Sequence, residues 1–81
     1  MYEKKSWIVK YNHKDGRKGT VKAITEIQKS AAFHYGNGKS GLLTVDGFEH
    51  GYDLRYCLDK DLHMTMLKEY FGDGLKEVTE I

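Results

Sequence analysis

The residue types best suited to covalent chemistry in this sequence are one cysteine, Cys57, and four histidines. A thiolate beside an imidazole can act as a nucleophile activated by a base. However, no catalytic signature surrounds Cys57, and a lone cysteine after an alternating strand is more typical of a small buried hydrophobe. An enzyme that uses Cys57 or a histidine is therefore the third of three functional hypotheses, and we expect no catalytic residue.

Cys57, Asp59, Asp61 and His63 are metal-ligating residue types that lie close together in the chain. Their spacing of two does not bring them to one helix face, where neighbours are three or four residues apart. Only one thiolate is available, and the two aspartates fit the start of a helix better. The sequence therefore predicts no metal site and no cofactor.

The segment Gly38-Lys39-Ser40 resembles the last three residues of a phosphate-binding loop. The full pattern requires a glycine at position 33, where this chain has Phe33, and it requires a strand before the loop and a helix after it. Here the expected order of helix and strand is reversed. A turn between a helix and a strand is therefore the better interpretation.

The most informative group is a set of basic side chains around a turn at Asp15-Gly16, a dipeptide typical of hairpins. Such a hairpin presents cations to a phosphate backbone or to an acidic protein surface. Trp7 and Tyr11 lie nearby but fit the core of a sheet better than a stacking surface for bases. The candidate partner-binding or nucleic-acid-binding residues are Lys10, His13, Lys14, Arg17, Lys18 and Lys22.

Charge is distributed unevenly along the chain although the formal net charge is only +1. Residues 1–40 carry nine basic and three acidic side chains, whereas residues 41–81 carry four basic and nine acidic side chains. This asymmetry indicates an electrostatic interaction surface. The alternative is that the two halves interdigitate in the fold and neutralise each other.

The elements that must position these residues begin with a hairpin over about residues 5–24. Trp7, Val9 and Tyr11 alternate with Ile8 and Lys10, as in a strand with one buried face. The return strand is expected over residues 20–24. Residues 20–35 also fit one long helix, and the sequence leaves these two alternatives open.

Thr25-Glu26-Ile27-Gln28 has the form of a capping box, which favours a short helix over about residues 26–35. A second hairpin is expected over about residues 41–56, with its tip at either Asp46-Gly47 or His50-Gly51. A second helix is expected over about residues 60–71, ended by Gly72. The tail from Leu75 is either an edge strand or a frayed end.

This order of elements predicts an α+β fold with a mostly antiparallel sheet of two hairpins and two helices packed on one face. With 81 residues and a mass of 9.3 kDa, we expect one small globular domain over residues 1–81. One cysteine forms no internal disulfide, which indicates a reducing compartment. The apolar run Trp7-Ile8-Val9 is too short for a signal peptide, and no run approaches a membrane span. The sequence therefore predicts a soluble cytoplasmic protein.

These observations favour a non-catalytic binding module that engages a protein partner, or a second copy of itself, through complementary charged surfaces. A nucleic-acid-binding module that uses the basic hairpin is the alternative. The size and the absence of motifs are similar to those of small accessory or inhibitor proteins of phages and mobile elements. That resemblance is one of style only, because no residue carries it.

Overall fold

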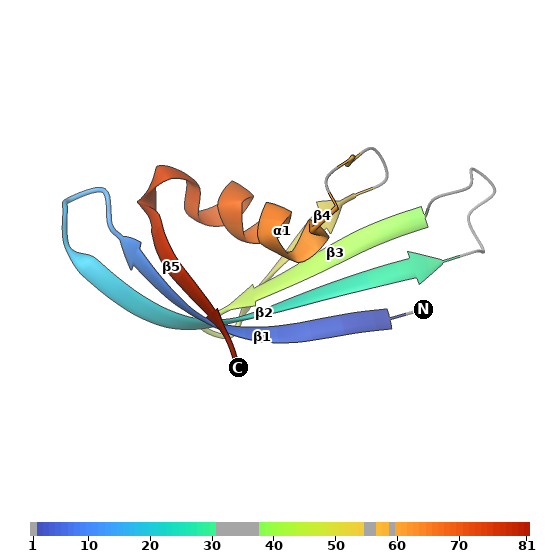
Figure 1. Ribbon diagram of the computed structural model, residues 1–81, viewed down its shortest axis with the longest axis horizontal. Coiled ribbons are helices and arrows are strands. Elements are labelled where there is room, and N and C mark those ends of the chain that lie inside the picture. The colour runs from blue at the N-terminus through green and yellow to red at the C-terminus, as the bar shows by residue number, and fades with distance from the viewer. Residues whose placement is uncertain (1, 31–37, 55–56, 59) are drawn as a thin grey trace.

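The computed structural model describes residues 2–30, 38–54, 57–58 and 60–81 (Figure 1). Its strands form a five-stranded antiparallel sheet in the order β4-β3-β2-β1-β5, with one α-helix, α1, across one face of it. The bounds are β1 Tyr2–Asn12, β2 Lys18–Ser30, β3 Gly38–Val45, β4 Phe48–Asp53, α1 Leu62–Phe71 and β5 Leu75–Glu80, with a short 3-10 turn at Gly72–Gly74 before β5.

The predicted N-terminal hairpin is confirmed, and its strands are longer than the sequence suggested. Trp7 pairs with Ala23 and Val9 pairs with Val21, and three of these four side chains are buried on the face that α1 covers. Gly16 has a φ of 87°, which glycine adopts without steric cost, and its N–H donates to the carbonyl of His13. The alternating apolar side chains and the turn residue therefore fix this register together.

The prediction of a helix over about residues 26–35 is wrong. Residues 26–30 continue β2, and residues 31–35 lie outside the described part of the chain. Thr25 does not cap a helix, because its fully buried hydroxyl accepts a hydrogen bond from the Trp7 indole. The local capping signal fails because β2 is the central strand, and ladders to both β1 and β3 outweigh a weak helical preference.

The second predicted hairpin is confirmed over β3 and β4, with its tip at Asp46-Gly47. Both residues have positive φ, 50° and 81°, as the tight turns between twisted strands require. His50-Gly51, the other candidate tip, lies within β4. Residues 55 and 56, at the expected end of this hairpin, lie outside the described residues.

The predicted C-terminal helix is confirmed and begins at Leu62. Asp61 is its N-cap, because the carboxylate accepts a hydrogen bond of 3.1 Å from the Met64 amide. Gly72 ends the helix with a φ of 57°. The helix buries Leu62, His63, Met66 and Leu67, whereas Tyr70 is 41% exposed.

The core lies between α1 and the covered face of the sheet. Leu67 packs with Trp7, Val9, Leu43 and Val45, and Met66 packs in a second cluster with Ile27 and Leu54. The tail from Leu75 is the edge strand β5, which pairs with β1. In the described part of the chain, no helix is long and apolar enough to cross a membrane.

Candidate functional site

Three of the six predicted basic residues lie together on the face of the sheet that points away from α1. Successive side chains of a strand alternate between faces, and Val9 and Val21 are on the covered face. Lys10, Lys18 and Lys22 are therefore on the opposite face, where all three are exposed. We call this surface the open face, because none of the described elements packs on it (Figure 1).

The other three predicted residues, His13, Lys14 and Arg17, lie in the hairpin turn. Arg17 Nε forms an ion pair of 2.6 Å with Asp15, and its backbone N–H donates to the same carboxylate. This backbone hydrogen bond, aided by the Arg17 guanidinium and the charge of His13, lowers the pKa of Asp15 below its ordinary value. Asp15 therefore partly neutralises the positive charge of Arg17 within the turn.

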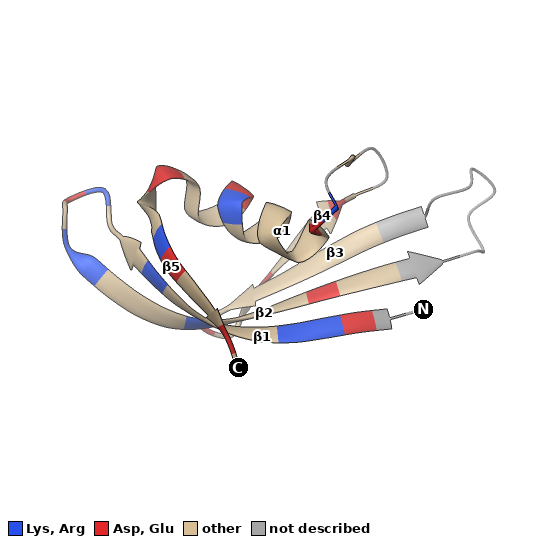
Figure 2. Cartoon of the chain, viewed as in Figure 1, with Lys and Arg blue, Asp and Glu red and all other residues tan. Residues whose placement is uncertain are grey.

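The C-terminal edge strand brings carboxylates from the acidic half of the chain beside the basic half (Figure 2). Lys10 Nζ lies 3.7 Å from Glu77 Oε2, and Lys5 Nζ lies 3.8 Å from Glu80 Oε1. Exposed pairs of this kind contribute about 0–1 kcal/mol each. Among the described residues, Lys14, Lys18 and Lys22 form no ion pair. Neutralisation of the basic hairpin is therefore partial.

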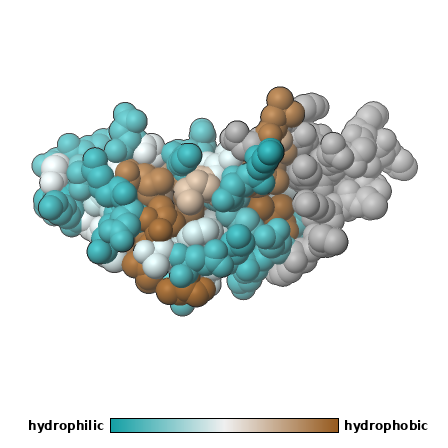
Figure 3. Space-filling view, viewed as in Figure 1, coloured by the Kyte–Doolittle hydropathy of each residue, from teal (hydrophilic) through white to brown (hydrophobic). Residues whose placement is uncertain are grey.

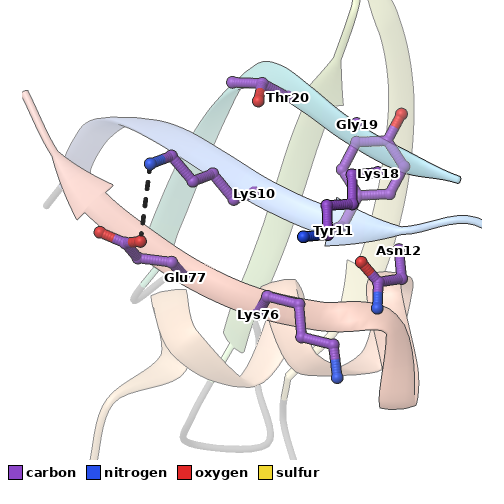
Figure 4. A pocket seen from close by; sticks show the side chains of 8 residues that line it. All are labelled: Lys10, Tyr11, Asn12, Lys18, Gly19, Thr20, Lys76 and Glu77. Carbon is purple, nitrogen blue, oxygen red and sulfur yellow. Dashed lines mark ion pairs between the residues drawn. The ribbon is translucent and has the colours of Figure 1, made fainter.

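A pocket of about 520 Å³ lies where the hairpin strands meet β5. Lys10, Lys18 and Lys76 line it, and Figure 4 shows Lys10 reaching toward Glu77 while Lys76 points away from that pair. A second pocket of about 500 Å³ lies between the hairpin turn and the end of α1, lined by His13, Lys14 and Asp73 among others. Both pockets combine basic side chains with a carboxylate.

The open face also carries an apolar strip that the sequence reasoning missed. Ile8, Ile24 and Leu42 come from three adjacent strands, and each is half-buried on this face. They are diagonal neighbours, because Ile8 pairs with Lys22 and Leu42 pairs with Glu26, each two residues from Ile24 on β2. Figure 3 shows apolar atoms at the lower edge of the molecule, on the side of the sheet away from α1.

The same face carries acidic side chains at its other end. Glu26 lies opposite Leu42 and Lys4, and Glu49 of the edge strand β4 lies opposite Thr44. The open face thus carries Lys10, Lys18 and Lys22 near the hairpin turn and an apolar centre. Glu26 lies beside Lys4 at its other end, and Glu49 lies on β4. The alternation of side chains within each strand is the sequence signal for this arrangement. The sequence does not show which strands pair, and that pairing brings these side chains together.

The residues considered for covalent or metal chemistry are placed differently. Cys57 packs against the cluster that contains Leu54 and Leu62, and it forms no hydrogen bond with a described histidine. His63 is 3% exposed, with Nδ1 2.6 Å from Thr25 Oγ1 and Nε2 3.3 Å from Glu3 Oε1. No group of three metal-ligating side chains is found in the described part of the chain. Asp59 lies outside the described residues.

The segment that resembled the end of a phosphate-binding loop begins a strand. Gly38, Lys39 and Ser40 are the first residues of β3 and pair with the end of β2. Such a loop needs consecutive backbone amides turned toward one anion. In a strand, the amides instead alternate in direction along the ladder. Comparison of the chain with known proteins gives no matching family model, no matching curated protein and no matching solved structure.

Proposed function

We propose that this chain is a non-catalytic binding module and that its partner is a protein docked on the open face of the sheet. The observation that carries the proposal is the strip of Ile8, Ile24 and Leu42 on a face that no described element covers. Antiparallel sheets often leave one face in water, but that face is then mostly polar. Three adjacent branched apolar side chains at its centre favour a surface that another protein buries.

The charges around this strip support a protein rather than a nucleic acid. Protein interfaces combine an apolar centre with a polar rim, whereas surfaces that bind the phosphate backbone are basic throughout. Here Lys22 lies on one side of Ile24 and Glu26 lies on the other. Glu49 adds a further carboxylate to the same face. A phosphate backbone laid along the open face would meet these acids and be repelled.

The proposal is tested by co-purification from the native host after nuclease treatment. The wild-type chain and Lys68→Glu, a charge reversal on the exposed side of α1, should both retain the same stoichiometric companion. Ile24→Glu should lose that companion, because a carboxylate would replace the centre of the apolar strip. Circular dichroism establishes that the variant is folded. Retention of the companion by folded Ile24→Glu would contradict the proposed surface.

Nucleic acid is a second candidate, favoured by the absence of ion pairs at Lys14, Lys18 and Lys22 in the described part of the chain. Contacts of these lysines with phosphates would release counterions, so affinity would fall steeply with salt. Lys14→Glu combined with Lys18→Glu should then abolish binding to mixed DNA and RNA. If the wild type binds neither at low salt, this alternative is excluded.

A further inference from the structure

We infer that the protein seated on the open face is a second copy of this chain, related to the first by a two-fold axis that passes near Ile24. This inference rests on the proposed function, and it names the partner. In a symmetric dimer the same patch serves both copies, so the patch must complement itself. The side chains along β2 meet this requirement at the centre of the open face.

Ile24 lies at the centre of the sheet. It belongs to β2, which has two strands on either side, and six residues of β2 precede it and six follow it. It pairs with Ser6 on β1 and with Thr44 on β3, which are small or half-buried side chains. A two-fold axis at this position therefore places Ile24 against its own copy with little to obstruct the contact.

The charges on either side of Ile24 are opposite and equally spaced. Lys22 precedes it by two residues and Glu26 follows it by two, so all three side chains point to the open face. An axis that crosses the strands reverses the direction of β2 in the second copy. Lys22 of each copy then faces Glu26 of the other, and two identical ion pairs form. Neither side chain has an ion-pair partner among the described residues of its own chain.

The apolar neighbours of Ile24 lie on a diagonal across the strands. Ile8 lies on β1 beside Lys22, and Leu42 lies on β3 beside Glu26, so they flank Ile24 on opposite sides. The axis that places Lys22 over Glu26 keeps each β1 over the other β1, so the two apolar strips cross at Ile24. Ile8 of each copy then lies over Lys4 of the other, because Lys4 pairs with Glu26. The two sheets would pack about 10 Å apart, as in a β-sandwich. The paired charges would then form the rim of this contact.

The size of the face is sufficient for a stable dimer. The molecule measures 45 × 21 × 21 Å along its principal axes. A long face of these dimensions offers on the order of 900 Å², and a standard interface buries roughly 800 Å² on each partner. The two-fold contact thus requires most of the open face, including the apolar centre and the charges of Lys22 and Glu26.

The test is sedimentation equilibrium from about 1 μM to about 1 mM, a range that resolves dissociation constants of moderate affinity. The wild type should form a dimer of the 9.3 kDa chain. K22E and E26K should each weaken dimerisation at least tenfold, because like charges would then face each other. Lys68→Glu, on α1, should dimerise as the wild type does.

Variants in which the charges at positions 22 and 26 are swapped give the decisive comparison in this experiment. The double variant K22E/E26K should dimerise again, and an equimolar mixture of the two single variants should form a heterodimer. A merely misfolded single variant would not recover in the mixture. A monomeric wild type across the range, or a dimer unaffected by either single variant, would overturn the inference. Recovery of a different host protein through Ile24 would then leave the proposed function standing, whereas no partner of either kind would contradict both.

Discussion

Trp7 and His63 share one hydrogen-bonding partner, the hydroxyl oxygen of Thr25. The Trp7 indole N–H donates to Thr25 Oγ1 over 2.7 Å, and His63 Nδ1 lies 2.6 Å from the same oxygen. The indole can only donate, so Oγ1 accepts from it and its own hydrogen can be donated to Nδ1. That arrangement places the imidazole hydrogen on Nε2, 3.3 Å from Glu3 Oε1. One buried hydroxyl thus ties β1, β2 and α1 together.

Thr25→Val should lower the free energy of unfolding by about 2–6 kcal/mol. Valine has nearly the same shape, but it leaves the buried indole N–H and the imidazole without their partner, at about 1–3 kcal/mol each. Urea unfolding followed by the fluorescence of Trp7, the only tryptophan, measures the change.

Thr44→Val is the matched control for this substitution. Thr44 is half-buried on the open face, and its side chain forms no hydrogen bond with another described residue. Its replacement should change stability by less than about 0.5 kcal/mol. Equal stability of the two variants would show that the Thr25 hydroxyl contributes nothing to the fold.

Gly41→Ala should destabilise the protein by about 1–3 kcal/mol, the usual cost of overpacking a core. A Cβ at Gly41 would collide with Met66 Sδ and would lie 2.8 Å from Leu54 Cδ1, so the absence of a side chain allows α1 to approach β3. Thermal or urea unfolding provides the measurement.

Gly51→Ala on the neighbouring strand β4 is the control, because a Cβ there has no neighbour within 4 Å. Its replacement should be neutral or stabilise the fold by about 0.4–1 kcal/mol through the reduced freedom of the unfolded chain. If Gly41→Ala were as stable as Gly51→Ala, close packing of Met66 on β3 would not be a determinant of the fold.

Asp15→Asn should destabilise the hairpin turn at neutral pH but not in strong acid. The pKa of Asp15 is lowered from 3.8 in the folded state, so its contribution is present above the unfolded pKa and is lost as the pH falls through the folded one. Amide exchange at Arg17, whose N–H donates to this carboxylate, should be faster in the variant at pH 7. If amide exchange at Arg17 still differed between wild type and Asp15→Asn below the folded and unfolded pKa values of Asp15, the charge of this carboxylate would not be the cause.

The sequence was most informative where local signals and strand pairing agree. The alternation of Trp7 and Val9 with Ile8 and the turn at Gly16 predicted what the structure contains. Of the two aspartates expected at the start of a helix, Asp61 is its N-cap. The signal at Thr25 misled because a capping box depends on four residues, whereas the fate of β2 depends on strands far away in the sequence. Nothing local indicated that its hydroxyl serves Trp7 and His63.

The candidate site was predicted only in part for the same reason. The basic hairpin follows from its own residues, but the acids that pair with it arrive on β5, as Lys10 and Glu77 show. The apolar strip likewise requires β1, β2 and β3 in register, since Ile8, Ile24 and Leu42 are far apart in the chain. Alternation fixes which face a side chain occupies, and only the topology determines its neighbours.

Tyr52→Phe should make the protein more resistant to alkali. Burial raises the pKa of Tyr52 above its ordinary value of 10.0, and the charges of Glu69 and Tyr70 raise it further. The folded state therefore holds this proton more tightly than the unfolded state does. The stabilisation is complete below the unfolded pKa and is lost as the pH rises through the folded one. Unfolding free energies measured across that interval should fall less steeply for Tyr52→Phe than for the wild type.

Glu69→Gln tests the cause of the raised pKa of Tyr52, whereas Tyr52→Phe removes the titrating group itself. It keeps Tyr52 but removes a negative charge that disfavours the tyrosinate, so the pKa of Tyr52 should move down toward 10.0. Ultraviolet absorbance of the tyrosinate measures the ionisation of Tyr52 directly. The Tyr52 titration is identified as the one that is missing in Tyr52→Phe. A Tyr52 titration that is the same with and without the Glu69 charge would mean that this charge does not contribute to the raised pKa of Tyr52.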